Sequence, residues 1–307
     1  MTTTMTSFAV SVGVADIRRC PDAASELVTQ ALMNAPVAAG EVAGEWTHAT
    51  LSDYTGWLRL DQLEEPVNRG FCKVGEHCRT PLQLMAVINK PRIALFAHAE
   101  NNDTLGTLYL STALPIVDTT VPGRVQVVLP GERTGWLSRD DVVIREGEEI
   151  YPRAETGTIT GYARAFLGRP YLWGGTSWEG IDCSGLVQLC YRMGGYIIPR
   201  DADQQHDFLP CRIDRAAMQQ GDLVFFGSQE ITHVAMALNN KEGLDASENR
   251  TGTSGTHGTL HAGEDGQHNP SVKKEQSCQS YHIRVLCLPL LKTYLSPLAQ
   301  WSSAMSP

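Results

Sequence analysis

Short apolar runs separated by turn residues fill the first 150 positions of this 307-residue chain. Apolar and polar residues alternate within most runs, which is the period of a half-buried β-strand. We expect strands at residues 8–14, 15–18, 27–32, 36–38, 46–50, 55–60, 93–97, 105–110, 114–117, 125–129 and 135–138. Many short strands at this spacing predict small antiparallel barrels.

A repeated motif divides this β-rich half of the sequence into two parts. Gly-Trp-Leu at 56–58 returns at 135–137, each time followed by a tail that contains Asp, and such self-similarity indicates related units. Residues 66–92 are polar and contain three prolines, which predicts a linker. We therefore predict one barrel over 1–65 and a second over 93–150; a single larger all-β domain is the alternative.

The pattern changes after residue 150. Longer runs suited to helices come first, Gly194 and Gly195 end the second of them, and apolar strands follow. The expected elements are helices at 156–167 and 184–194 and strands at 221–227, 231–238, 243–247 and 281–288. We predict one domain over 151–295 with a flexible Gly/Thr/Ser/His-rich insertion at 248–278, and a C-terminal tail at 296–307.

A cysteine stands at the start of the second predicted helix. A Tyr-Leu-Trp-Gly-Gly turn at 171–175 leads into Asp182-Cys183-Ser184-Gly185. The unpaired N–H groups and the positive dipole end of a helix N-terminus favour a thiolate, which is the form of cysteine that attacks carbonyl carbon. A buried structural cysteine is the alternative, but such residues are more typical of the middle of a helix.

A nucleophilic cysteine needs a base, and His233 lies fifty residues further on within the apolar run 231–238. Asp245 follows twelve residues later. If residues 243–247 form the next antiparallel strand, Asp245 lies beside His233 and orients its ring. A turn or capping role for Asp245 is equally compatible with the sequence.

Charge and cysteine usage exclude several classes of protein. The net charge of −9, from 34 acidic and 25 basic residues, argues against a general nucleic-acid binder and against capture by anionic wall polymers.

The eight cysteines are scattered along the sequence, so they do not form the pattern of a disulfide framework. Cys72, His77 and Cys78 fit no common zinc spacing, and the histidines at 257, 261 and 268 are more typical of a mobile loop than of a metal site. We expect neither a metal nor an organic cofactor.

The N-terminus lacks a basic segment followed by an apolar core, so no secretory signal is recognised. No apolar run is long enough to span a membrane. These features favour a cytoplasmic, monomeric protein; a mature secreted chain without its leader would look the same, and both alternatives stay open.

Five motifs occur in an order that resembles the NlpC/P60 family of cysteine peptidases. They are residues 169–175, 182–187, 199–201 with 204–205, 221–226 and 233–234. The resemblance covers roughly residues 155–290 and implies an α+β, papain-like domain in which a cysteine-bearing helix packs on a histidine-bearing antiparallel sheet. The preceding barrels resemble bacterial SH3 modules, with an Ala-Asp-Ile-Arg entry and a closing Tyr54-Thr55-Gly56-Trp57-Leu58.

The resemblance also implies catalytic roles. Cys183 is then the nucleophile, His233 the general base and acid, and Tyr171 a hydroxyl near the nucleophile that helps to stabilise the oxyanion. A packing aromatic is the alternative for Tyr171. The family's third position is commonly His, and here the matching position holds Asp245.

The implied reaction is hydrolysis of cell-wall peptides between γ-D-glutamate and a diamino acid. The domain order resembles recycling-type endopeptidases, in which the residues matching Glu26, Tyr54 and Asp182 receive the free amino group of an N-terminal L-Ala. A carboxylate pair and a phenol form a small cation site; a solvated Glu26 and a core Tyr54 are the alternatives.

Three further residues are predicted to bind substrate. Ser184 and either Arg200 or Asp201 are candidates to contact the D-Glu carboxylate or to order its pocket. A structural ion pair of Arg200 with Asp201 or a neighbour is the alternative. A non-catalytic muropeptide-binding protein, or an amidase or acyltransferase of the same fold, stays as a rival function. The sequence does not specify whether meso-diaminopimelate or L-Lys follows D-Glu.

Overall fold

The computed structural model describes residues 6–67, 84–146, 150–209, 212–247, 255–257 and 284–286. The chain divides into two compact units. The first comprises Met1–Pro152 and Leu172–Ile181, and the second comprises Arg153–Tyr171 and Asp182–Pro307. In the part of the chain that the structure describes, no helix is long and apolar enough to cross a membrane.

The first unit begins with a seven-stranded antiparallel sheet. Its strands are β1 (Thr6–Val10), β2 (Val14–Arg18), β3 (Leu27–Leu32), β4 (Pro36–Ala43), β5 (Trp46–Thr50), β6 (Thr55–Arg59) and β7 (Leu63–Glu64). They lie in the order β3-β2-β6-β5-β4-β1-β7. Alternate residues point into the core, as in β2, where Ala15 and Ile17 are fully buried between half-buried neighbours. The predicted period of two is therefore realised here.

A second seven-stranded sheet repeats this topology. Its strands are β8 (Leu84–Ile88), β9 (Arg92–Phe96), β10 (Thr104–Tyr109), β11 (Ala113–Asp118), β12 (Arg124–Leu129), β13 (Arg133–Ser138) and β14 (Val142–Glu146). Their order, β10-β9-β13-β12-β11-β8-β14, is that of the first sheet with every number raised by seven. The repeated Gly-Trp-Leu motif lies on β6 and β13, which occupy the same position in the two sheets.

Strand β8 corrects the predicted linker at 66–92. Residues 84–88 pair with both β11 and β14, with Ala86 opposite Leu114 and Ile144. Four of its five side chains are buried. Pro81 and Pro91 led us to treat the whole segment as irregular, but these prolines flank the apolar run without interrupting it, and the run is free to form a strand.

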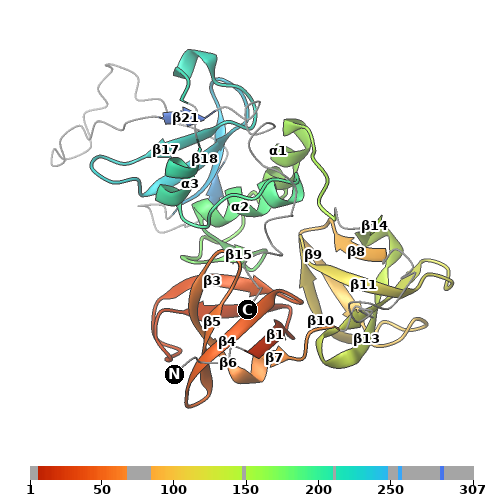
Figure 1. The fold of residues 1–307 in the computed structure, drawn as a ribbon. Helices are drawn as coiled ribbons and strands as arrows, with labels where there is room; N and C mark the ends of the chain where they lie inside the picture. Colours follow the sequence, from red (N-terminus) through yellow and green to blue (C-terminus); the bar gives the residue numbers. More distant parts are fainter. Residues whose placement is uncertain are drawn as a thin grey trace, which may run out of the picture. The chain divides into compact units, whose positions relative to one another are not determined.

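The second unit combines helices with an antiparallel sheet. Its elements are α1 (Thr156–Ala165), α2 (Cys183–Met193), α3 (Ala202–Phe208), β17 (Leu223–Phe226), β18 (His233–Ala237), β19 (Gly243–Ser247), β20 (Gly255–His257) and β21 (Arg284–Leu286). The strand order is β20-β19-β18-β17-β21. Helix α2 is buried along almost its whole length and packs on α1, β18 and β19 (Figure 1).

Two predicted segments of this unit are described only in part. Strand β20 lies inside the predicted flexible insertion at 248–278 and pairs with β19, which corrects that prediction for residues 255–257. Strand β21 falls within the predicted strand 281–288 and pairs with β17. The remainder of the insertion and the predicted tail at 296–307 lie outside the described residues.

Residues 172–181 belong to the first unit, although we predicted them as part of the domain over 151–295. The backbone N–H of Thr176 donates to Gln30 Oε1 at 3.0 Å, which ties the turn to β3. Gly174 has a φ of +75°, and a Cβ there would lie 2.4 Å from the Leu27 carbonyl oxygen. Glycine is thus required for both the backbone conformation and the close approach to β3.

Candidate active site

Cys183 is the first residue of helix α2. Asp182 caps the helix with an extended backbone, and its Oδ1 accepts a 2.6 Å hydrogen bond from the backbone N–H of Gly185. Cys183 itself is 8% exposed. The predicted presentation of a cysteine at a helix start is therefore present, at the positive end of the helix dipole.

His233 opens strand β18, and Asp245 lies in the neighbouring strand β19. The distance from His233 Nε2 to Asp245 Oδ2 is 2.8 Å. Cys183 is close enough to the imidazole to contribute to the rise in its pKa. Because Nε2 faces Asp245, Nδ1 is the nitrogen left to face the sulfur. The structure therefore brings Cys183, His233 and Asp245 together, with the ring hydrogen-bonded to Asp245.

The electrostatic surroundings hold a proton on His233. Burial lowers its pKa, but hydrogen bonds to Asp245 and Cys183, together with the negative charge of both partners, raise the pKa to about 10. An imidazolium beside a thiolate is the ion pair that a cysteine hydrolase uses, with the acid already in place for the leaving group.

Arg200 forms a buried ion pair beneath the start of α2. Its side chain is 1% exposed, and Nη2 lies 2.6 Å from Asp182 Oδ2 while Nη1 lies 3.0 Å from Asp182 Oδ1. Nη1 also donates to Ser184 Oγ at 2.9 Å. Burial lowers the pKa of Arg200, but attraction to Asp182 outweighs it and raises the pKa. This geometry favours the structural ion pair over a substrate clamp for Arg200, and the partner is Asp182.

The remaining predicted residues of this unit have less specific surroundings. Tyr171 is half-buried, and its oxyanion role stays a prediction. Asp201 precedes α3 and makes no side-chain cap, although Gln204 Nε2 donates to its Oδ2 at 3.5 Å. We overlooked Gln205, which is fully buried and whose Nε2 donates to the Ser184 carbonyl at 3.0 Å. Its place in the third motif was the only available signal.

Glu26 and Tyr54 lie in the first unit. Glu26 Oε2 lies 2.5 Å from Arg19 Nε, and Glu26 Oε1 accepts a 3.0 Å hydrogen bond from Trp173 Nε1. The hydrogen bond from Arg19 lowers the pKa of Glu26, burial raises it, and Trp173 lowers it further, so the carboxylate form is favoured. Tyr54 is half-buried and packs against the apolar core of the first sheet. Neither Arg19 nor Trp173 was predicted from sequence.

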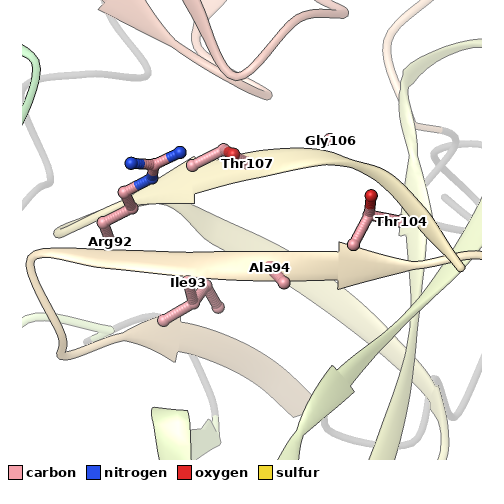
Figure 2. A pocket seen from close by; sticks show the side chains of 6 residues that line it. All are labelled: Arg92, Ile93, Ala94, Thr104, Gly106 and Thr107. Carbon is pink, nitrogen blue, oxygen red and sulfur yellow. The ribbon is translucent and has the colours of Figure 1, made fainter. Parts of the chain in front are cut away.

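A shallow pocket of about 410 Å³ lies on β9 and β10 (Figure 2). It is lined by Arg92, Ile93, Ala94, Thr104, Gly106 and Thr107. Its one charged side chain, Arg92, has Nε 3.5 Å from Glu179 Oε1. The lining includes none of the predicted catalytic or substrate-binding residues, so we assign the pocket no chemistry. Within the described ranges, no cluster of three or more His, Cys, Asp or Glu side chains could hold a metal ion.

The site combines a cysteine at a helix start, a histidine close to it and a carboxylate bound to the second ring nitrogen. This combination is typical of a cysteine hydrolase. Comparison with known proteins agrees with this class. The model of the NlpC/P60 family matches residues 168–266, and that of the bacterial dipeptidyl-peptidase SH3 domain matches residues 17–63. The chain belongs to the NlpC/P60 family of cysteine peptidases and carries a bacterial SH3 domain ahead of the peptidase domain.

Two curated relatives match most of the chain. A γ-D-glutamyl-L-lysine dipeptidyl-peptidase of Bacillus cereus is 30% identical over 230 residues, covering 70% of this chain and 66% of the relative. A protein of the same name from Bacillus subtilis is 29% identical over 231 residues, covering 68% of each chain. The chain thus spans about two thirds of the length of these relatives.

The solved structures give the fold. The crystal structure of an NlpC/P60 family protein from Bacillus cereus superposes with a TM-score of 0.71 at 21% identity, covering 82% of this chain and 93% of that one. At this identity the likeness shows the fold alone.

Proposed function

We propose that this protein is a cysteine endopeptidase that hydrolyses the bond between γ-D-glutamate and a diamino acid in cell-wall peptides. The observation that carries the proposal is the grouping of Cys183, at the start of a buried helix, with the hydrogen-bonded pair His233 and Asp245. The names of the Bacillus relatives support the same bond specificity. The intact grouping argues against the rival of a purely binding protein.

The proposed reaction proceeds through a thioester. The Cys183 thiolate attacks the γ-carbonyl carbon of D-Glu, and the oxyanion that forms is stabilised by the Cys183 backbone N–H and the Tyr171 hydroxyl. His233 then gives its Nδ1 proton to the leaving amine of the diamino acid as the C–N bond breaks. In the second half, His233 removes a proton from water, hydroxide attacks the thioester, and the thiolate leaves. Asp245 holds the ring in place throughout.

We infer that the enzyme prefers peptides with a free N-terminal L-Ala. Glu26 supports this preference because Arg19 and Trp173 each hold one of its carboxylate oxygens, while the side chain stays 38% exposed and ionised. An ammonium ion is a suitable further partner for such a carboxylate, with Tyr54 as an accompanying acceptor. Asp182 is the third predicted member, and both of its oxygens already accept from Arg200.

The predicted architecture is also part of this proposal. We propose that the second sheet is a second SH3-like barrel, because its strand order repeats that of the first. We likewise propose an α+β class for the second unit, because its helices precede an antiparallel sheet.

A panel of tripeptides tests the function. L-Ala-γ-D-Glu-L-Lys and its meso-diaminopimelate counterpart should release the dipeptide L-Ala-γ-D-Glu, and Cys183→Ala should abolish release. N-acetylation of L-Ala should lower kcat/KM at least about 10-fold. Cleavage that persists in Cys183→Ala would disprove the mechanism, and equal cleavage of free and acetylated peptides would disprove the amine preference.

A further inference from the structure

The cap of helix α2 and the nucleophile make opposing electrostatic demands. Asp182 accepts from the Gly185 N–H at 2.6 Å and from Ser184 Oγ at 3.3 Å, which stabilises the start of the helix. Asp182 also directly precedes Cys183 and is only 7% exposed. A buried carboxylate next to a sulfur disfavours ionisation of that sulfur, because like charges repel strongly where water is excluded.

Arg200 offsets this repulsion. Its two terminal nitrogens bind the two oxygens of Asp182 at 3.0 and 2.6 Å, in the parallel geometry that guanidinium and carboxylate groups share. The resulting pair carries no net charge. Arg200 is also within electrostatic range of the sulfur, because the negative charge of Cys183 is among the causes that raise the pKa of Arg200.

The elements that pack around α2 carry further charged groups. They are His233 on β18, Asp245 on β19 and Asp201 ahead of α3. His233 is shared between Cys183 and Asp245. His206 on α3 contacts the Phe225 ring and Asp207. Arg200 is the residue that makes a direct two-point contact with the Asp182 carboxylate.

We propose that Arg200 is a positioning residue that neutralises the Asp182 helix cap, so that a carboxylate cap and the Cys183 thiolate coexist in the first turn of α2. The inference rests on the proposed function, in which Cys183 reacts as a thiolate. Arg200 acts through Asp182 and needs no contact with substrate, as its nearly complete burial requires.

The test is the pH dependence of Cys183 alkylation in the full-length protein. Iodoacetamide is added between about pH 4 and pH 10, and carbamidomethylation of Cys183 is followed by mass spectrometry of its peptide, because seven other cysteines are present. The variants are Arg200→Gln, Asp182→Asn and the double variant Asp182→Asn/Arg200→Gln. Asparagine still caps a helix, so the double variant keeps the cap and leaves no unpaired buried charge.

The two single variants should shift the alkylation midpoint in opposite directions. Arg200→Gln removes the positive charge that faces Asp182 and should raise the midpoint by about one pH unit or more, whereas Asp182→Asn removes the negative charge that faces Arg200 and should lower it. The double variant should return to within about half a unit of wild type. Three results would overturn the proposal. The two single variants could shift the midpoint in the same direction, or they could fold and show no shift. The double variant could also have a midpoint displaced as far as that of Arg200→Gln.

A matched control separates charge from loosened packing. Gln205→Ala removes the hydrogen bond from Gln205 Nε2 to the Ser184 carbonyl in the same turn without changing any charge. It should slow alkylation without moving the midpoint, and a shift equal to that of Arg200→Gln would overturn the electrostatic role. If Arg200→Gln does not fold, the comparison of Asp182→Asn with the double variant still decides the question, because a midpoint that does not rise again on removing Arg200 contradicts the proposal.

This readout is independent of peptide cleavage. A wild-type protein that cleaves no γ-D-Glu peptide would refute the proposed function, while opposite midpoint shifts would still establish charge cancellation by Arg200. Normal cleavage without opposite shifts would refute the inference alone.

Discussion

His233 Nε2 lies 2.8 Å from Asp245 Oδ2, across two neighbouring strands whose register places the carboxylate behind the imidazole. The hydrogen bond leaves Nδ1 to face Cys183 and fixes the orientation of the ring. The partner of the ring is therefore a carboxylate with a full negative charge. That charge is among the causes of the high pKa of His233.

Asp245→Asn should lower kcat/KM about 10²- to 10⁴-fold. The amide keeps the size of the side chain but removes the charge that stabilises the imidazolium. Steady-state cleavage of L-Ala-γ-D-Glu-L-Lys measures the loss, and Asp207→Asn, at an exposed carboxylate on α3, is the control. An Asp245→Asn enzyme with wild-type activity would show that Asp245 has no orienting role.

The alkaline limb of kcat/KM should lie near pH 10. The acid that protonates the leaving amine is His233, whose pKa is raised to about 10, so activity should persist above neutral pH and fall only as this proton is lost. Asp245→Asn should move the limb to lower pH, because it removes one of the causes that raise the pKa. A limb near pH 6.5, the value of a free imidazole, would contradict the structure.

The free energy of unfolding should depend on the protonation of His233. Because the pKa of His233 in the fold lies above its unfolded value of 6.5, protonation of His233 stabilises the fold. This contribution is fully present below about pH 6.5 and is lost as the pH rises through about 10. Chemical denaturation across this window should show a steeper fall in the free energy of unfolding for wild type than for His233→Gln, and equal slopes would contradict the assignment.

Glu26→Gln should lower kcat/KM for peptides with a free amino terminus about 10- to 100-fold, and acetylated peptides should be little affected. The change removes the carboxylate that Arg19 and Trp173 hold in place. Glu45→Gln is the matched control, since Glu45 is another ion-paired, exposed glutamate of the first unit, with Arg59 as its partner. Similar losses in both variants would show that Glu26 acts only through the stability of this unit.

Gly174→Ala should destabilise the first unit by about 1–3 kcal/mol or more. The new Cβ would combine a φ of +75° with a 2.4 Å approach to the Leu27 carbonyl oxygen. Gly44→Ala separates the two causes, because Gly44 has a φ of +62° but has no atom within 4 Å of such a Cβ. Thermal unfolding should show the larger loss for Gly174→Ala, and equal losses would leave strain as the sole cause.

Local patterns in the sequence were sufficient for most elements. Alternation placed the strands, and the apolar run after Cys183 placed that residue at a helix start, because both features depend on residues close together in the chain. The motif order also fixed the family, which the family models and relatives confirm. The missed strand β8 shows the limit, because prolines beside a short apolar run resemble a linker until the partner strands β11 and β14 are present.

Only the tertiary structure decided which polar groups are partners. Asp245 was equally compatible with a turn, and the strand register placed it against His233. Arg200 had several candidate carboxylates, and burial beneath α2 selected Asp182, eighteen residues away. The turn at 172–181 follows the chain of the peptidase domain but packs on β3. The partner of a charged side chain depends on which parts of the fold exclude water around it. Residues that are adjacent in the sequence do not determine this.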